Sequence, residues 1–340
     1  MNTGAGVRVS LSGRTDLGQT RDHNEDTFLV ADLAGEATDL TTELRDHPVG
    51  ARGSLFLVAD GMGGAAAGEL ASSMAAGEIL AYLRRVWADD DEPTGPLLAR
   101  RMREALEHAN TRLHEYATAH PEVRGMGTTA TAAAVIGQDL YVAQIGDSRA
   151  YLIRSGTATQ LTRDQSLTQR LVEAGELTEE EAEASERRNI ILQALGPDAS
   201  VRVDLSHQVL RRGDVLVLCS DGLSSAVKRQ EIAETAGGDS DVAEAAQELI
   251  AVANARGGAD NITVVVARFD GPGLAEPDIT DPRGYAPYET AEAGGAVVPA
   301  GPEDPEVLPE VPLAERKGLG PWPWYVLLVG MVVLGVILLL

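Results

Sequence analysis

Aspartates recur in this sequence at the points where apolar, β-branched runs begin or end. Five of them share this placement, four beside a run and one in a short turn between two runs: Asp26, Asp60, Asp147, Asp221 and Asp260. Runs that end in this way can pack together only if the carboxylates are neutralised, because like charges repel strongly at low dielectric. Divalent cations would neutralise them, and a site built from oxygen ligands favours Mg²⁺ or Mn²⁺.

Each of these features also has an ordinary interpretation. An Asp-Gly pair after a strand, such as Asp60-Gly61 or Asp221-Gly222, is most often a turn. Arg21 is compatible with a surface residue and Asp147 with a hairpin residue. The recurrence of the pattern in one chain is what favours a shared site.

The apolar runs predict a mixed α+β fold. Strands are expected in the alternating or β-branched runs at 7–11, 27–30, 54–59, 128–136, 140–145, 150–153, 201–209, 215–219 and 262–269. Helices are expected at 65–87, 97–119, 167–174 and 241–255. Strands outnumber helices and are often joined by short turns, which favours antiparallel sheets over alternating parallel units. We expect the stretch 35–52 to be a surface loop.

Composition excludes several classes of protein. A hydrophobic content of 44% suits a folded core, and a single cysteine excludes a disulfide framework or a Cys-rich metal site. The formal net charge of −24 argues against nucleic-acid binding, which requires a basic surface.

The composition changes after residue 270. Nine of the 16 prolines lie between residues 271 and 312, and acids outnumber bases over 271–317. We interpret residues 1–270 as one folded domain and 271–317 as an acidic, Pro-rich disordered linker.

The segment 322–340 contains 19 uncharged residues, about 28 Å of helix at 1.5 Å per residue. This length suits a single C-terminal transmembrane helix, and the aromatic residues at its start suit a membrane interface. Arg316 and Lys317 precede it, which predicts a single-pass protein of the cell membrane with a cytoplasmic folded domain. The alternative is a buried core helix.

Six short motifs occur in order along residues 7–270. They are Arg21-Asp-His-Asn-Glu-Asp26, Asp60-Gly-Met-Gly-Gly64, Gly125-Met-Gly-Thr-Thr129, Gly146-Asp-Ser-Arg149, Ser220-Asp-Gly222 and Asp260-Asn261. No single motif is specific, but the ordered set resembles the metal-dependent (PPM, or type 2C) serine/threonine protein phosphatases, in their bacterial branch. The resemblance implies two packed antiparallel β-sheets flanked by helices, a four-layer αββα sandwich.

The resemblance also implies roles for individual residues. Asp60 would bridge two ions of Mn²⁺ or Mg²⁺, with the Gly61 carbonyl and Asp26 in the same centre. Asp221 and Asp260 would complete one shell, and Asp147 matches the position that, together with Asp221, holds a third ion. Arg21 matches the phosphate-binding arginine, and a guanidinium fork suits a phosphate beside metal ions.

The sequence departs from the family pattern at two positions. Met62 stands where many eukaryotic members have histidine, so we assign the proton for the leaving oxygen to metal-bound water. Gln165 stands where bacterial members usually have histidine, in the segment that matches the mobile flap beside the family's active site. Arg187 and Arg188 in that segment are candidate contacts to substrate or an ordinary solvated pair.

We therefore predict a membrane-tethered phosphatase. It would hydrolyse phosphoserine and phosphothreonine in proteins through a metal-bridging hydroxide and reverse Ser/Thr kinase signalling. Its partners would be phosphoproteins, including membrane kinases, and we expect a monomer. The alternatives are a non-catalytic pseudophosphatase that serves as a binding module and a Mg/Mn hydrolase of small phosphoesters.

Overall fold

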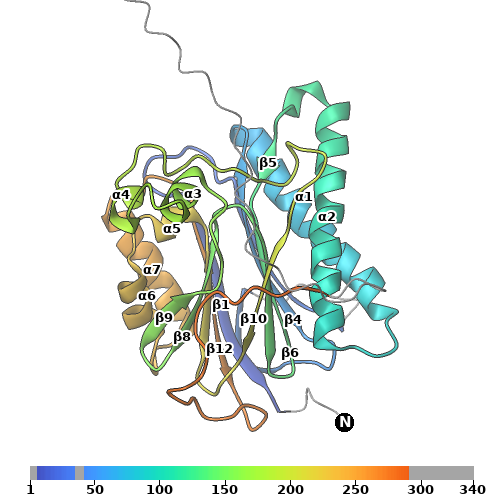
Figure 1. Ribbon diagram of the computed structural model, residues 1–340, viewed down its shortest axis with the longest axis vertical. Helices are drawn as coiled ribbons and strands as arrows, with labels where there is room; N and C mark the ends of the chain where they lie inside the picture. Colours follow the sequence, from blue (N-terminus) through green and yellow to red (C-terminus); the bar gives the residue numbers. More distant parts are fainter. Residues whose placement is uncertain (1–5, 35–41, 291–340) are drawn as a thin grey trace, which may run out of the picture. The chain divides into compact units, whose positions relative to one another are not determined.

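Two antiparallel β-sheets lie face to face at the centre of the structure, and helices cover the outer face of each sheet (Figure 1). The computed structural model describes residues 6–34 and 42–290 of the 340-residue chain. Within these residues the layers run helix, sheet, sheet, helix. The prediction of two packed antiparallel sheets flanked by helices is confirmed for this part of the chain.

The first sheet contains the N-terminal strand and the last one. Its strands lie in the order β3 (Glu43–Pro48), β1 (Arg8–Asp16), β12 (Ile262–Asp270), β11 (Val215–Cys219), β8 (Arg149–Arg154) and β9 (Thr157–Gln160). Strands β1 and β12 pair from Arg8 opposite Asp270 to Asp16 opposite Ile262. The outer face of this sheet packs on α5 (Asp221–Ser224), α6 (Arg229–Ala236) and α7 (Val242–Ala255).

The second sheet carries the two long helices. Its strands lie in the order β10 (Asp204–Val209), β7 (Asp139–Ile145), β6 (Ala130–Ile136), β4 (Ser54–Met62) and β2 (Asp26–Asp32), with the short β5 (Gly127–Thr128) paired to β4. Helices α1 (Ala65–Ala88) and α2 (Gly95–Ala119) pack on its outer face. A single 3₁₀ turn at Pro121–Val123 follows α2, and α3 (Leu167–Glu173) and α4 (Glu179–Glu183) lie between β9 and β10.

Strand β4 shows why the central strands have no polar alternation. Leu55 and Leu57 point toward α1 and α2, whereas Phe56 and Val58 point toward the first sheet. Successive side chains leave a strand on opposite faces, and here both faces are buried. The run 55–59 therefore has to be apolar throughout.

The sequence did not predict β3, β9, α4, α5 or α6, and two of these show why. The expected loop at 35–52 contains β3, an edge strand whose residues are mostly exposed and therefore carry no apolar alternation. Helix α6 has only eight residues and buries Ile232, Ala233 and Ala236, which is too short an apolar pattern to recognise.

Residues 271–290, called here the strap, continue the fold beyond β12. Leu274 is buried at 2% exposure. The strap then follows the edge of β10, where His207 N–H donates to the Ala286 carbonyl at 3.1 Å and Tyr288 N–H donates to the Leu205 carbonyl at 2.8 Å. These twenty residues lie in the predicted disordered linker, but the unpaired edge of β10 supplies backbone partners that their composition does not reveal.

The strap also neutralises buried charge. Arg154, at 2% exposure, forms two hydrogen bonds with Asp214 at 2.8 and 2.6 Å. Asp281 of the strap lies 3.8 Å from Arg154 and receives a hydrogen bond from Arg211 at 3.0 Å. The hydrogen bonds from Arg211 lower the pKa of Asp281 to about 2, so this carboxylate is ionised at neutral pH.

The remaining C-terminal predictions lie outside the described residues. These are the rest of the linker, 291–317, and the transmembrane helix at 322–340. In residues 6–34 and 42–290, no helix has both the length and the apolar character to cross a membrane.

We predict that the strap stabilises the folded domain. A chain ending at Asp270 should have a lower free energy of unfolding than a chain ending at Thr290. Loss of the buried Leu274 side chain alone would cost about 2 kcal/mol, and the edge of β10 would lose its partner. Urea unfolding of the two chains, followed by circular dichroism, measures the difference. Equal midpoints would mean that the strap rests on the surface without contributing to stability.

Candidate metal centre

The fold brings the five predicted aspartates to one end of the paired sheets. Asp26 and Asp60 lie opposite each other on β2 and β4. Asp221 is the first residue of α5, directly after β11, Asp260 lies just before β12, and Asp147 lies in the turn between β7 and β8. Burial raises the pKa of Asp60 well above its ordinary value, and the charges of the other four aspartates raise it further.

Three other aspartates of this group, Asp26, Asp147 and Asp221, have raised pKa values as well. Burial is the main cause for each: it raises the pKa of Asp26 and of Asp221 to about 6, and that of Asp147 to about 7. The charge of Asp221 adds to the shift of Asp147, and the charge of Asp260 adds to that of Asp221. Several carboxylates thus share a poorly solvated region in which full ionisation is unfavourable without a compensating cation.

Two oxygen atoms in this group are buried without a hydrogen-bond partner. They are Oδ1 of Asp26 and Oδ1 of Asp147. The other carboxylate oxygen of Asp26 accepts a hydrogen bond from the Ser220 hydroxyl at 2.7 Å. A buried, unpaired carboxylate oxygen is costly, and a divalent cation is the ligand that would satisfy it. The residues present therefore fit a Mg²⁺ or Mn²⁺ centre.

The carboxylates do not form a closed cage. In the part of the chain that the structure describes, no three His, Cys, Asp or Glu side chains converge as a complete ligand set. This agrees with the chemistry of Mg²⁺, which keeps several waters and takes few protein ligands.

The backbone around Asp60 is held by neighbouring hydroxyl groups. The Asp60 N–H donates to Thr129 Oγ1 at 2.9 Å, and the Thr128 hydroxyl donates to the Asp60 carbonyl at 2.9 Å. Gly61 follows, where a Cβ atom would lie 2.2 Å from the Gly68 carbonyl oxygen of α1. Only glycine fits here, so the strand end and α1 approach closely beside the carboxylates.

Arg21 lies at the rim of the cluster. Its Nη2 is 2.7 Å from Asp260 Oδ2, and its side chain is 49% exposed. The hydrogen bond to Asp260 raises the pKa of the guanidinium, and the charges of Asp60 and Glu25 act in the same direction. A cation that is both exposed and adjacent to the carboxylates is placed to meet an anionic ligand arriving from solvent.

Asn261 holds the loop that carries Arg21. Its Oδ1 accepts the Glu25 N–H at 2.8 Å, and its Nδ2 donates to the carbonyls of Leu17 and His23 at 3.0 and 2.9 Å. This role was not predicted from the sequence. The Asp-Asn pair was the available signal, but its partners lie more than 230 residues away.

The departures from the family pattern lie as follows. Met62 is the last residue of β4 and has no titratable group. Arg187 and Arg188 are exposed. Gln165 is buried and accepts a hydrogen bond from the Gly146 N–H.

The single cysteine, Cys219, is a core residue and not a nucleophile. Burial raises the pKa of its thiol to about 12.

Comparisons with known proteins show the family of this chain. Residues 45–263 match the family model described as Protein phosphatase 2C. The chain is 41% identical over 265 residues to the serine/threonine protein phosphatase PstP of Mycobacterium tuberculosis strain H37Rv, with 77% of this chain and 46% of PstP covered. It is 36% identical over 258 residues to a putative protein phosphatase 2C-type of Streptococcus pyogenes, with 76% of this chain and 96% of that protein covered.

A solved structure shows the same architecture. The catalytic domain of the phosphatase PstP in complex with two manganese ions superposes with a TM-score of 0.62 at 37% identity, covering 78% of this chain and 99% of that one. The chain spans about half the length of the full PstP protein. By the family model, these relatives and the carboxylate cluster, the chain belongs to the Protein phosphatase 2C family.

Proposed function

We propose that this chain is a serine/threonine protein phosphatase that uses Mn²⁺ or Mg²⁺ held by its aspartate cluster. The observation that carries the proposal is the pair of buried, unpartnered oxygens of Asp26 and Asp147 within a group of five carboxylates. The related PstP catalytic domain is described as a complex with two manganese ions, which supports the same cofactor here.

Each predicted ligand would have a role in this centre. Asp60 would hold two ions together, with Asp26 and the Gly61 carbonyl beside it and with Asp221 and Asp260 from segments that adjoin strands of the opposite sheet. Asp147, together with Asp221, would hold a third. When bound, such ions lower the pKa of water and offset negative charge on phosphate oxygens, which is the chemistry that phosphoester hydrolysis needs.

The chain's own residues would bind and orient the substrate. Arg21 would bind the phosphate at the exposed rim and stabilise charge as it develops on the phosphate oxygens. The position of Met62 supplies no proton to the leaving serine or threonine oxygen, so that proton must come from water.

The location and partners are also part of the proposal. The uncharged segment 322–340 would tether the protein in the cell membrane with the phosphatase domain in the cytoplasm. Tethering would raise the effective concentration of membrane-bound phosphoproteins, including Ser/Thr kinases. The tether is proposed from the composition of segment 322–340, and the kinase partners follow from the proposed tether and phosphatase activity.

The metal ligands can be tested by charge removal. We expect Asp60→Asn and Asp221→Asn to abolish Mn²⁺-dependent phosphate release from phosphothreonine peptides, because each removes an anionic ligand. EDTA should inhibit the unaltered chain, and added Mn²⁺ should restore its activity. Asp239→Asn, at an exposed position between α6 and α7, is the matched control and should retain activity. Wild-type turnover in either site variant would contradict the metal assignment. A complete lack of activity in the unaltered chain would favour the binding-module alternative.

Arg21 can be tested by its effect on substrate affinity. Arg21→Ala should raise KM and lower kcat/KM by 10- to 100-fold, roughly 1.4–2.7 kcal/mol of transition-state binding. Arg21→Lys should recover only part of this loss, because an ammonium cannot form the two-pronged contact. Arg229→Ala, an exposed arginine on α6, should have no effect. Steady-state kinetics that do not change in Arg21→Ala would assign the residue to the solvated surface.

Metal-free stability should depend on pH. Asp26, Asp147 and Asp221 have pKa values of about 6 to 7 in the fold, against 3.8 without it. Between pH 4 and 7 the folded chain therefore binds more protons than the unfolded one, and its stability falls as pH rises. In EDTA, the melting temperature should be higher at pH 5.5 than at pH 8, with a smaller difference in Asp147→Asn. Saturating Mn²⁺ should raise the pH 8 value. An equal change of melting temperature with pH in Asp147→Asn and in the unaltered chain would contradict the assigned cause.

A further inference from the structure

The turn that carries Asp147 is bound at both the N–H and the carbonyl of Gly146 by a single residue, Gln165. The Gly146 N–H donates to Gln165 Oε1 at 2.9 Å, and the Gln165 N–H donates to the Gly146 carbonyl at 2.9 Å. Gln165 is buried at 8% exposure, so water competes little for these bonds. Its side chain therefore fixes the Ile145–Gly146 peptide, and its backbone N–H binds the next peptide, which leads into Asp147.

The orientation of the Gln165 amide follows from its partners. Its Nε2 lies 3.3 Å from Asp204 Oδ2 and 3.4 Å from the Arg202 carbonyl oxygen, and both of these oxygens accept hydrogen bonds. Its Oε1 faces the Gly146 N–H, which can only donate. The two ends of the amide thus have opposite requirements, and a residue without both groups would leave a buried polar atom unsatisfied.

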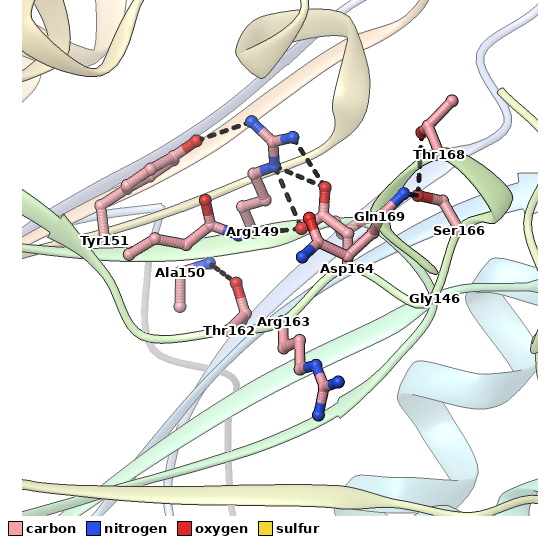
Figure 2. Close-up of polar contacts among 12 residues, drawn as sticks. Gly146, Arg149, Ala150, Tyr151, Thr162, Arg163, Asp164, Ser166, Thr168 and Gln169 are labelled. Carbon is pink, nitrogen blue, oxygen red and sulfur yellow. Dashed lines mark hydrogen bonds and ion pairs between the residues drawn. The ribbon is translucent and has the colours of Figure 1, made fainter. Parts of the chain in front are cut away.

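The loop around Gln165 is anchored by other contacts. Arg149 forms a two-pronged ion pair with Asp164 at 2.7–3.2 Å, and the Ala150 N–H donates to Thr162 Oγ1 at 3.2 Å (Figure 2). The backbone of Gln165 also receives the Leu192 N–H at 2.8 Å. Loss of the Gln165 amide should therefore leave the loop in place and release only the turn.

The carboxylate of Asp147 depends on this turn for its position. One of its oxygens, Oδ1, has no hydrogen-bond partner, so no protein contact holds that oxygen in place. Gly146 adopts φ +98°, a conformation that costs little only for glycine. Gln144 contributes from β7, where its Nε2 donates to the carbonyls of Gly146 and Ser148 at 3.1 and 3.2 Å. The N–H of Gly146 instead donates to the Gln165 side chain.

We propose that Gln165 is a positioning residue for the cation site at Asp147, through the hydrogen bond between its side-chain amide and the Gly146 peptide. This rests on the proposed function, in which Asp147 is a ligand. Gln165 itself does not touch the cation, and it acts by holding the Asp147 carboxylate where an ion can use its unpaired oxygen.

The test compares two buried glutamines. Gln165→Leu removes both polar groups at nearly constant volume, and Gln165→Met is a second variant in case the first misfolds. Gln208→Leu is the control, because Gln208 is also buried and donates to a backbone carbonyl, that of Gly284 in the strap. Two readouts apply to each: hydrogen exchange of the Gly146 amide in metal-free protein and calorimetric titration with Mn²⁺, with Asp147→Asn as reference.

We expect Gly146 exchange to accelerate at least tenfold in the Gln165 variants and to stay unchanged in Gln208→Leu. The Mn²⁺ site that disappears in Asp147→Asn should weaken at least tenfold, and the remaining Mn²⁺ binding should change less than twofold.

Three outcomes would overturn the proposal: unchanged Gly146 exchange, wild-type Mn²⁺ affinity despite faster exchange, or an equal loss of affinity in Gln208→Leu. Failure of the proposed function looks different. In that case, the unaltered chain shows no Mn²⁺-dependent release of phosphate from phosphothreonine peptides, whatever the Gln165 variants do.

Discussion

Mutual repulsion among buried carboxylates is the constraint around which this structure is arranged. Asp26 and Asp60 on one sheet meet Asp221 and Asp260, which lie next to strands of the other sheet, and Asp147 joins them from a turn. Burial and neighbouring charge both oppose their ionisation, so the folded chain carries an electrostatic cost at this end of the sheets. A divalent cation offsets this repulsion, because it binds carboxylate oxygens that have no other partner.

Neutral polar side chains hold this charged group in place. Thr129 fixes the backbone of Asp60, Asn261 fixes the loop of Arg21, and Gln165 binds the N–H of Gly146, the residue before Asp147. Hydroxyl and amide groups can do this without adding charge to a region that already holds too much of one sign. The ligands themselves can then keep oxygens free of protein hydrogen bonds, as cation binding requires.

The strap shows a second use of charge, in which buried charged groups are paired with opposite charges. Arg154 and Asp214 are both buried and hydrogen bonded, and Asp281 brings a further carboxylate to them from beyond β12. These pairs lie with the backbone contacts along β10, so the strap combines ion pairing with protection of a sheet edge. The Pro-rich composition of the strap suggested disorder, but composition does not show whether the fold offers an edge strand with unpaired backbone groups.

The sequence by itself determined the layered fold and the identity of the carboxylate group. Central strands such as β4 are apolar on both faces, and five aspartates at the ends of such strands or in the turn between two of them indicate a shared cation site. Strand β3 and helix α6 could not be predicted in the same way, because an exposed edge strand and a short helix carry too weak a pattern.

Only the tertiary structure decided which atoms are satisfied and which are not. Asn261 contacts residues more than 230 positions away, and Gln165 binds Gly146 in another segment of the chain. One oxygen of Asp26 and one of Asp147 are buried where the fold places no partner beside them. Apolar side chains reveal their burial by periodicity, whereas a single buried polar side chain has no period. Its role depends on the partner that the fold places beside it.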